Sequence, residues 1–226
     1  MRILVVAATS TEIAPLVAIL RGESDIAPGV QACAYAGHAI DILTTGVGMV
    51  ATSARCSQAL TRTSYDLGLN LGVCGSFDRA LEPGAVVHVV ADRIAELGAE
   101  NDEAFLTIQQ LHLLGDDEFP FTRGELVNAS PPANEALRHL PAVNGITVNT
   151  VHGNARSIAA VVERFTPRVE SMEGAAFMYA CLIHGLPFAQ VRAVSNAVEP
   201  RNRVAWKLAD AIRNLGETAI SILECA

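Results

Sequence analysis

The chain alternates between short apolar runs and segments whose apolar residues recur every three or four positions. The residues that follow Arg2, as far as Ala8, form an apolar run rich in Ile and Val, which is typical of a strand buried on both faces. A helical pattern begins directly after this run, and either Ser10 or Thr11 is a suitable N-cap for it. The chain therefore starts with a predicted strand and a predicted helix.

The same alternation continues to the C-terminal end. Further strands are predicted over residues 30–35, 39–44, 66–72, 85–91, 146–151 and 188–194, and helices over residues 49–62, 155–165, 174–184 and 206–223. Turns are predicted at Gly75-Ser76 and Pro83-Gly84, and residues 97–145 are expected to form long loops with short elements around Leu111 and Leu137. Strands that alternate with helices predict a single three-layer α/β/α domain over residues 1–226, with a mixed, largely parallel central sheet.

Composition narrows the class of protein. Of the 226 residues 50% are hydrophobic and 18% are charged, which excludes a disordered chain. The net charge is −8, and no basic run offers a surface for nucleic acid or for an anionic membrane. No apolar stretch reaches the roughly 20 residues of a membrane span. The five cysteines include no C-x-x-C pair, so a reducing, cytoplasmic location is expected.

Polar residues that could carry chemistry lie where predicted strands end, which is where ligands bind in α/β folds. Glu12 falls in the first turn of the first helix, and Glu173 opens an apolar helix. A buried carboxylate is costly unless something binds it, and the hydroxyls of a sugar are one candidate. The polar segment 195–203 follows another strand. The six histidines show no metal-ligand spacing, so neither a metal nor a cofactor is expected.

One glycine motif leaves a second interpretation open. Gly46 and Gly48 match the G-x-G-x-x-A form of a dinucleotide-binding turn, and Asp66 lies at a suitable distance beyond them. In that fold, however, the glycines follow the first strand. The same glycines equally suit a tight turn and close packing of a helix.

Several motifs occur together, in order, over nearly the whole chain. They are the first strand with Glu12, Gly46-Val47-Gly48, Asn70-Leu71-Gly72-Val73-Cys74-Gly75, Glu170-Ser171-Met172-Glu173-Gly174, Arg192-Ala193-Val194-Ser195-Asn196 and the segment 198–203. By these motifs the chain resembles the superfamily of nucleoside phosphorylases and hydrolases. It is similar there to the nucleosidases of methylthioadenosine and adenosylhomocysteine, and the segment 198–203 favours the futalosine hydrolase family, which serves a menaquinone route.

The resemblance implies a role for each matching residue. Glu12 would activate the attacking water, Glu173 would hold the ribose hydroxyls with Met172 packed against the sugar, and Gly75 and Ser195 would line the substrate site. Asn196 would face the purine. The resemblance also implies a small-molecule nucleoside substrate and a homodimer or larger homo-oligomer.

Asn196 departs from the adenine-specific nucleosidases, which carry Asp at this position. An amide always has an N–H to donate, so it suits the O6 or N7 acceptor of a 6-oxopurine, where a carboxylate would place acceptor against acceptor. The substrate base is therefore expected to be hypoxanthine, as in futalosine. An arginine from the final segment, Arg201 or Arg203, is expected to bind the benzoate of that substrate.

Hydrolysis is favoured over phosphorolysis. Phosphorylases of the superfamily carry a phosphate-binding arginine where this chain has Asn70, although Arg55 and Arg79 could still bind an anion. A purine nucleoside phosphorylase, a methylthioadenosine nucleosidase, a nicotinamide-dependent oxidoreductase and a non-catalytic nucleoside-binding protein stay open as alternatives.

Overall fold

The computed structural model describes residues 1–226, the side chain of Glu23 excepted. The strands are β1 (Arg2–Ala7), β2 (Arg21–Ala27), β3 (Val30–Tyr35), β4 (His38–Thr44), β5 (Leu67–Ser76), β6 (Val86–Ile94), β7 (Gly98–Asn101), β8 (Ala104–Thr107), β9 (Phe121–Thr122), β10 (Glu125–Val127), β11 (Ala142–Thr147), β12 (Val169–Ser171) and β13 (Phe188–Ala197). The helices are α1 (Ser10–Val17), α2 (Met49–Arg62), α3 (Glu135–Arg138), α4 (Ala155–Phe165), α5 (Gly174–His184) and α6 (Leu208–Glu224), with a 3-10 turn η1 (Arg203–Ala205).

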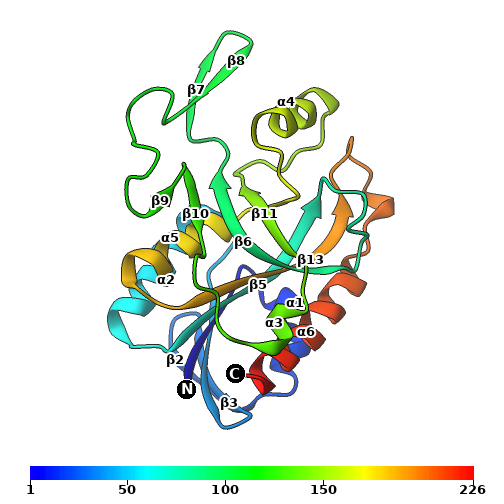
Figure 1. The fold of residues 1–226 in the computed structure, drawn as a ribbon. Coiled ribbons are helices and arrows are strands. Elements are labelled where there is room, and N and C mark those ends of the chain that lie inside the picture. The colour runs from blue at the N-terminus through cyan, green and yellow to red at the C-terminus, as the bar shows by residue number, and fades with distance from the viewer.

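Helices cover both faces of a large mixed sheet (Figure 1). The strands β4, β1, β5 and β13 pair in parallel, whereas β2, β3, β9 and β10 pair antiparallel at the margins. Helices α1 and α6 pack on one face over a buried core that includes Leu16 and Leu215. Helices α2 and α5 pack on the other face, with Cys56 and Phe177 in the core there. The predicted three-layer α/β architecture with a mixed sheet is confirmed.

Part of the sheet closes on itself. Strand β5 pairs with β12, β12 with β11, β11 with β6, β6 with β13, and β13 again with β5. Small apolar side chains fill the space enclosed by these strands, among them Cys74, Val89 and Val194. This closure brings β12 and β13 to opposite sides of β5, where both of them border the candidate site.

Several predicted boundaries were wrong. Gly75 and Ser76 do not form a turn but continue β5, because β12 and β13 both pair with the strand there. The N-cap of α1 is Thr9 instead of Ser10 or Thr11. The strand predicted over residues 146–151 is β11, which ends at Thr147, and the final helix begins at Leu208.

Other elements had no clear sequence pattern. Strand β2 and the three-residue β12 were not predicted, and the expected loop region contains the hairpin β7–β8 and the short strands β9 and β10. A short helix does lie at Leu137, whereas the residues around Leu111 form only turns. Helix α5 is buried as expected, except at Leu182, which is half-buried, and at Tyr179, Ile183 and His184, which are exposed. No helix in the described part of the chain has both the length and the apolar character to span a membrane.

Candidate active site

Glu12 lies at the carboxyl end of β1, held by its own helix and by β5. It is the third residue of α1, and its Oε2 accepts a hydrogen bond of 2.9 Å from the backbone N of Thr9, the N-cap. Its Oε1 accepts a bond of 3.1 Å from the backbone N of Val73. The side chain is 8% exposed, so the carboxylate is fixed but remains within reach of a small molecule. The helix N-terminus further stabilises its negative charge.

Glu173 lies opposite, at the start of α5, and is 5% exposed. Its Oε1 accepts a hydrogen bond of 3.0 Å from the backbone N of Gly48. Gly48 has a φ of 100°, a conformation that L side chains rarely adopt. The glycine therefore turns an amide at the N-terminus of α2 towards a carboxylate of this chain.

The hydrogen bond from Gly48 to Glu173 argues against a dinucleotide-binding role for the glycine motif. In a dinucleotide-binding turn the helix N-terminus receives a pyrophosphate, whereas Glu173 occupies it here. The turn also follows β4 and not the first strand. Asp66, the expected ribose ligand of a dinucleotide, accepts a hydrogen bond of 2.7 Å from the backbone N of Arg2 instead.

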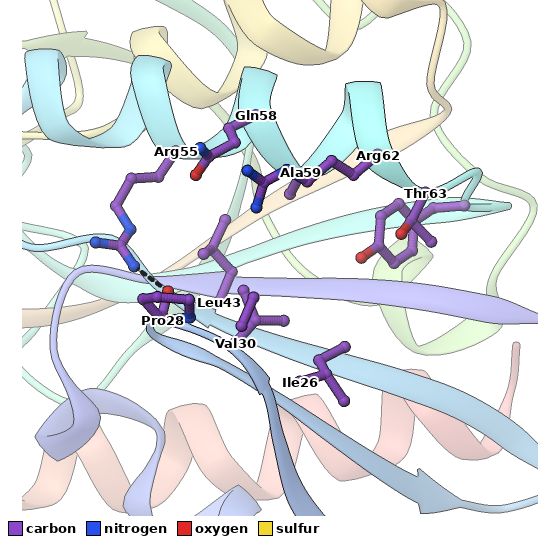
Figure 2. Close-up of a pocket in the computed structure, with 11 residues that line it drawn as sticks. Ile26, Pro28, Val30, Leu43, Arg55, Gln58, Ala59, Arg62 and Thr63 are labelled. Carbon is purple, nitrogen blue, oxygen red and sulfur yellow. Dashed lines mark hydrogen bonds between the residues drawn. The ribbon is translucent and has the colours of Figure 1, made fainter.

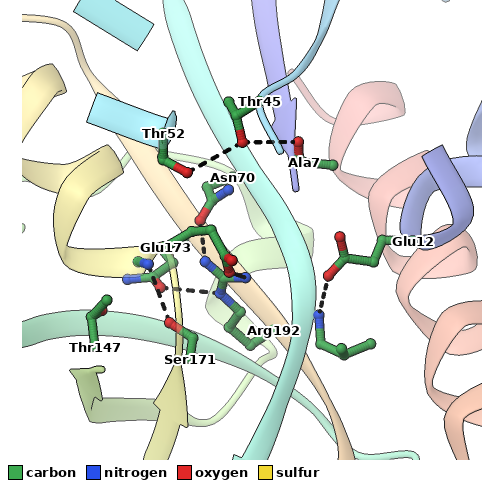
Figure 3. A network of polar contacts seen from close by, with 12 residues as sticks. Ala7, Glu12, Thr45, Thr52, Asn70, Thr147, Ser171, Glu173 and Arg192 are labelled. Carbon is green, nitrogen blue, oxygen red and sulfur yellow. Dashed lines mark hydrogen bonds and ion pairs between the residues drawn. The ribbon is translucent and has the colours of Figure 1, made fainter. Parts of the chain in front are cut away.

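A buried arginine links the two sides of the site. Arg192 on β13 is 1% exposed, and its Nη1 lies 3.7 Å from Oε2 of Glu173 (Figure 3). Its Nη2 donates to Oδ1 of Asn70, and its Nε donates to Oε1 of Gln190 at 3.1 Å. A Cβ at Gly72 would overlap this guanidinium and lie 3.0 Å from Oε1 of Glu12. Arg192 thus forms its ion pair with Glu173, and the missing side chain at Gly72 leaves room for its guanidinium.

The network continues beneath the site to Asp92. Its Oδ2 accepts a bond of 3.0 Å from Nε2 of Gln190, and its Oδ1 accepts one of 3.0 Å from Thr147. Burial raises the pKa of Asp92 to about 6, although these two hydrogen bonds and the nearby charge of Arg192 act in the opposite direction. The backbone N of Ala175 donates to Thr147 Oγ1 at 2.7 Å, which ties the network to the start of α5.

The second half of the site lies farther along β5. Asn196 on β13 is in register with Gly75, two residues beyond Val73, or about 7 Å at ~3.3 Å per residue. Ser195 Oγ lies 2.8 Å from Oδ1 of Asn196 and 3.1 Å from the carbonyl O of Cys74, and it can donate to either.

A small cavity of about 50 Å³ opens beside Asn196. The residues around it come from β5, β12, β13 and two loops, and they include Gly75, His152, Glu170, Asn196, Arg201 and Trp206. The exposed guanidinium groups of Arg201 and Arg203 lie 5.9 and 6.0 Å from the ring centre of Trp206. Met172 is half-buried next to Glu173 in the chain.

The other arginines that could bind an anion lie elsewhere. Arg55 reaches from α2 to the carbonyl of Pro28, in a separate cavity of about 360 Å³ between α2 and the strands β2 to β4 (Figure 2). Arg79 pairs with Glu199 at 3.1 Å on the surface. Among the described residues, no group of three or more His, Cys, Asp or Glu is arranged to hold a metal ion.

Sequence reasoning did not single out the buried network as functional. Gln190 and Arg192 are polar residues at alternate positions of an otherwise apolar strand, and that spacing puts both on one face. Asn70 and Asp92 similarly interrupt apolar strands. Polar residues within otherwise apolar, buried strands were the sequence signal that could have indicated this network. His152 and Glu170 gave no such signal, because they lie in a loop and in a very short strand.

This fold has known counterparts. The sequence model of the Phosphorylase superfamily matches residues 2–224, so the chain belongs to that superfamily. A solved 5'-methylthioadenosine/S-adenosylhomocysteine nucleosidase of Neisseria meningitidis, in complex with methylthio-immucillin-A, has the same fold, with a TM-score of 0.83 and 16% identity over 100% of this chain and 99% of that one.

Curated relatives narrow the family. The futalosine hydrolase of Streptomyces coelicolor is 35% identical over 181 residues, 77% of this chain and 74% of that protein. The futalosine hydrolase of Acidothermus cellulolyticus is 31% identical over 222 residues, 92% of this chain and 86% of that protein. Within the superfamily the chain therefore belongs with the futalosine hydrolases.

Proposed function

We propose that this chain hydrolyses the N-ribosidic bond of futalosine and releases hypoxanthine, as a step of a menaquinone route. The observation that carries the proposal is that Glu12 contacts Val73 and Asn196 pairs with Gly75, two residues farther along β5, a separation that suits the sugar and the base of one nucleoside. The relatives named futalosine hydrolase support the identity of the substrate.

The proposed reaction passes through an oxocarbenium-like ribosyl group. The C1′–N9 bond breaks and its electron pair leaves with the purine, towards which the Asn196 amide donates a hydrogen bond. The oxygen of a water molecule bonds to C1′, and Glu12 takes a proton from this water, while the departing purine anion takes up a proton from solvent and leaves as hypoxanthine. The nearby carboxylates stabilise the positive charge of the sugar, as in glycoside hydrolysis. Glu173 accepts hydrogen bonds from the ribose hydroxyls, with Met172 packed against the ring.

Water is favoured over phosphate as the nucleophile. Arg192, the buried cation of the site, already contacts Asn70, Gln190 and Glu173. A phosphate placed beside Glu12 would also meet like charge. We therefore assign hydrolysis to the site and not phosphorolysis.

Two further features belong to the proposal. We assign the benzoate of the substrate to Arg201 or Arg203, which would have to turn from Trp206 towards it. We also propose a cytoplasmic homodimer or larger homo-oligomer, which would cover exposed apolar side chains such as Leu113 and Phe119, each 72% exposed. Light scattering coupled to size exclusion tests the assembly.

The decisive experiment is an assay for free base in phosphate-free buffer. Purified protein is incubated with futalosine, inosine or methylthioadenosine, and the products are separated by chromatography. We expect hypoxanthine from futalosine without added phosphate, and methylthioadenosine left intact. Release that depends on phosphate would identify a phosphorylase, and no release from any nucleoside would favour a binding protein.

A further inference from the structure

Gly75 separates two polar side chains that face the same space. It pairs with Glu170 of β12 on one side and with Asn196 of β13 on the other. A Cβ placed on Gly75 would lie 2.8 Å from Cγ2 of Val198, 3.4 Å from Nδ2 of Asn196 and 3.5 Å from Cγ of Glu170, so these three side chains close around the glycine. Glu170 and Asn196 both line the cavity of about 50 Å³ beside Gly75, which we term the slot.

Glu170 is buried, 4% exposed, and has no part in the mechanism described above. Its Oε1 accepts a hydrogen bond of 3.1 Å from the backbone N of His152, and its Oε2 lies 2.7 Å from Nδ1 of the same residue. Because an ionised carboxylate can only accept, Nδ1 carries the hydrogen of that bond. Each carboxylate oxygen still has a lone pair for one more donor. Glu170 is thus an oriented acceptor at the edge of the slot.

A 6-oxopurine and a 6-aminopurine differ in the hydrogen-bond donors and acceptors along the edge of the base. A 6-oxopurine offers acceptors at O6 and N7 and a donor at N1–H, whereas a 6-aminopurine offers a donor at its amino group and an acceptor at N1. An amide N–H on one side of the slot and a carboxylate on the other match the 6-oxopurine. With adenine, the carboxylate would face the lone pair of N1.

From this match we infer that Glu170 is a specificity-determining residue that accepts the N1–H of a 6-oxopurine, while Asn196 donates to O6 or N7. The inference rests on the proposed function and adds a second contact that reads the base. His152 is a positioning residue for this contact, since its backbone N and its Nδ1 both hold the carboxylate. Its ring in turn lies edge-on to Phe77, with 6.1 Å between the ring centres.

Binding of free bases tests the inference separately from catalysis. Hypoxanthine, 1-methylhypoxanthine and adenine are titrated by calorimetry into the wild type, Glu170→Gln and the surface control Glu224→Gln. We expect the wild type and the control to prefer hypoxanthine over 1-methylhypoxanthine, which lacks the N1–H, by at least about tenfold. Glu170→Gln should lose roughly ten- to hundredfold in the ratio of hypoxanthine to adenine affinity, because its amide can turn an N–H towards N1 of adenine.

Two results would overturn the inference. One is equal affinity of the wild type for hypoxanthine and its 1-methyl derivative, a measurement that needs no variant to fold. The other is a Glu170→Gln protein that loses affinity for hypoxanthine and adenine by the same factor. His152→Phe, which removes the Nδ1 donor, should lower the same affinity ratio, and an unchanged ratio would remove His152 from the contact.

The outcome is distinguishable from that of the proposed function. A wild type that shows these base preferences but releases no hypoxanthine from futalosine would refute the proposed hydrolase activity and support recognition of the base by Glu170. A wild type that hydrolyses futalosine but binds 1-methylhypoxanthine as well as hypoxanthine would support the hydrolase and refute the role of Glu170.

Discussion

The two carboxylates of the candidate site, Glu12 and Glu173, have different partners. Glu12 is held only by backbone and hydroxyl donors, whereas Glu173 faces the guanidinium of Arg192. A carboxylate without a cationic partner is the better acceptor for a proton from water. At the residue scale this contrast favours Glu12 as the base and Glu173 as the sugar ligand.

We expect Glu12→Gln to lower kcat for futalosine by about 10²- to 10⁴-fold, the usual contribution of a general base. The amide keeps the shape of the side chain and can still accept the bond from Val73, so the fold should persist. Steady-state kinetics and a thermal melt measure both effects. A variant that keeps more than a tenth of the wild-type kcat would show that another group activates the water.

Asn196→Asp replaces the amide donor that is proposed to face the purine by a carboxylate, which only accepts hydrogen bonds. The carboxylate would repel O6 and N7 of hypoxanthine and accept from the amino group of adenine, so the preference for a 6-oxopurine should fall by about ten- to hundredfold. The ratio of kcat/KM for inosine to that for adenosine reports this change. An unchanged ratio would contradict the assignment of Asn196 to the base.

Arg201→Ala tests the proposed contact with the benzoate of the substrate. Because Arg201 is exposed, its ion pair with a benzoate should be weak, and we expect KM for futalosine to rise about two- to fivefold. Inosine has no benzoate, so its KM should stay within error. Equal increases for both nucleosides would make the role of Arg201 structural, and Arg203→Ala provides the comparison within the same segment.

Residues 198–207 form a segment that borders the cavity beside Asn196. Main-chain hydrogen bonds from Arg201 to Gly153 and from Lys207 to Ser195 hold this segment over a cavity of about 50 Å³. Ligand pockets usually measure about 300–1,000 Å³, so we expect the segment to move when a nucleoside binds. The movement would carry Trp206 with it.

Trp206 is the only tryptophan of the chain and therefore reports this movement. We expect its fluorescence emission to change saturably when hypoxanthine is added, because the ring leaves its contact with two arginines and the cavity wall. A fluorescence titration compared with calorimetry checks the expectation. Binding seen by calorimetry without a change in emission would mean that the segment stays in place.

Helices and strands were predicted well where an apolar pattern extends over many residues. Helices α2, α4 and α5 begin and end as expected, because each carries an apolar stripe or an apolar stretch of at least eleven residues. The three residues of β12 carry no such pattern. The extension of β5 through Gly75 could not be predicted either, because its pairing partners come from distant parts of the chain.

At the scale of the whole molecule, the buried polar network affects stability. Asp92 has a raised pKa in the folded protein, so between about pH 4 and pH 6 the folded state binds more protons than the unfolded state. The contribution of Asp92 to the free energy of unfolding is then greatest at low pH and falls as the pH rises through about 6.

Asp92→Asn tests this contribution. The amide does not ionise, so the variant should gain up to about 2–3 kcal/mol relative to the wild type between pH 4 and pH 7. Urea unfolding of both proteins at several pH values gives the difference, in which other titrating groups cancel. A difference that is constant with pH would show that Asp92 keeps the same protonation in both states.

The sequence by itself determined the α/β class, most of the helices, Glu12 and Glu173 at the starts of helices, and the chemical preference of the amide at Asn196. Each of these follows from local periodicity or from the chemistry of one side chain. The tertiary structure alone decided that β5, β12, β11, β6 and β13 close into a ring and that Gly75 separates Glu170 from Asn196. It also decided that Arg192 faces Glu173. Such contacts join residues far apart in the chain, and their geometry depends on strand pairing and register, which no local pattern specifies.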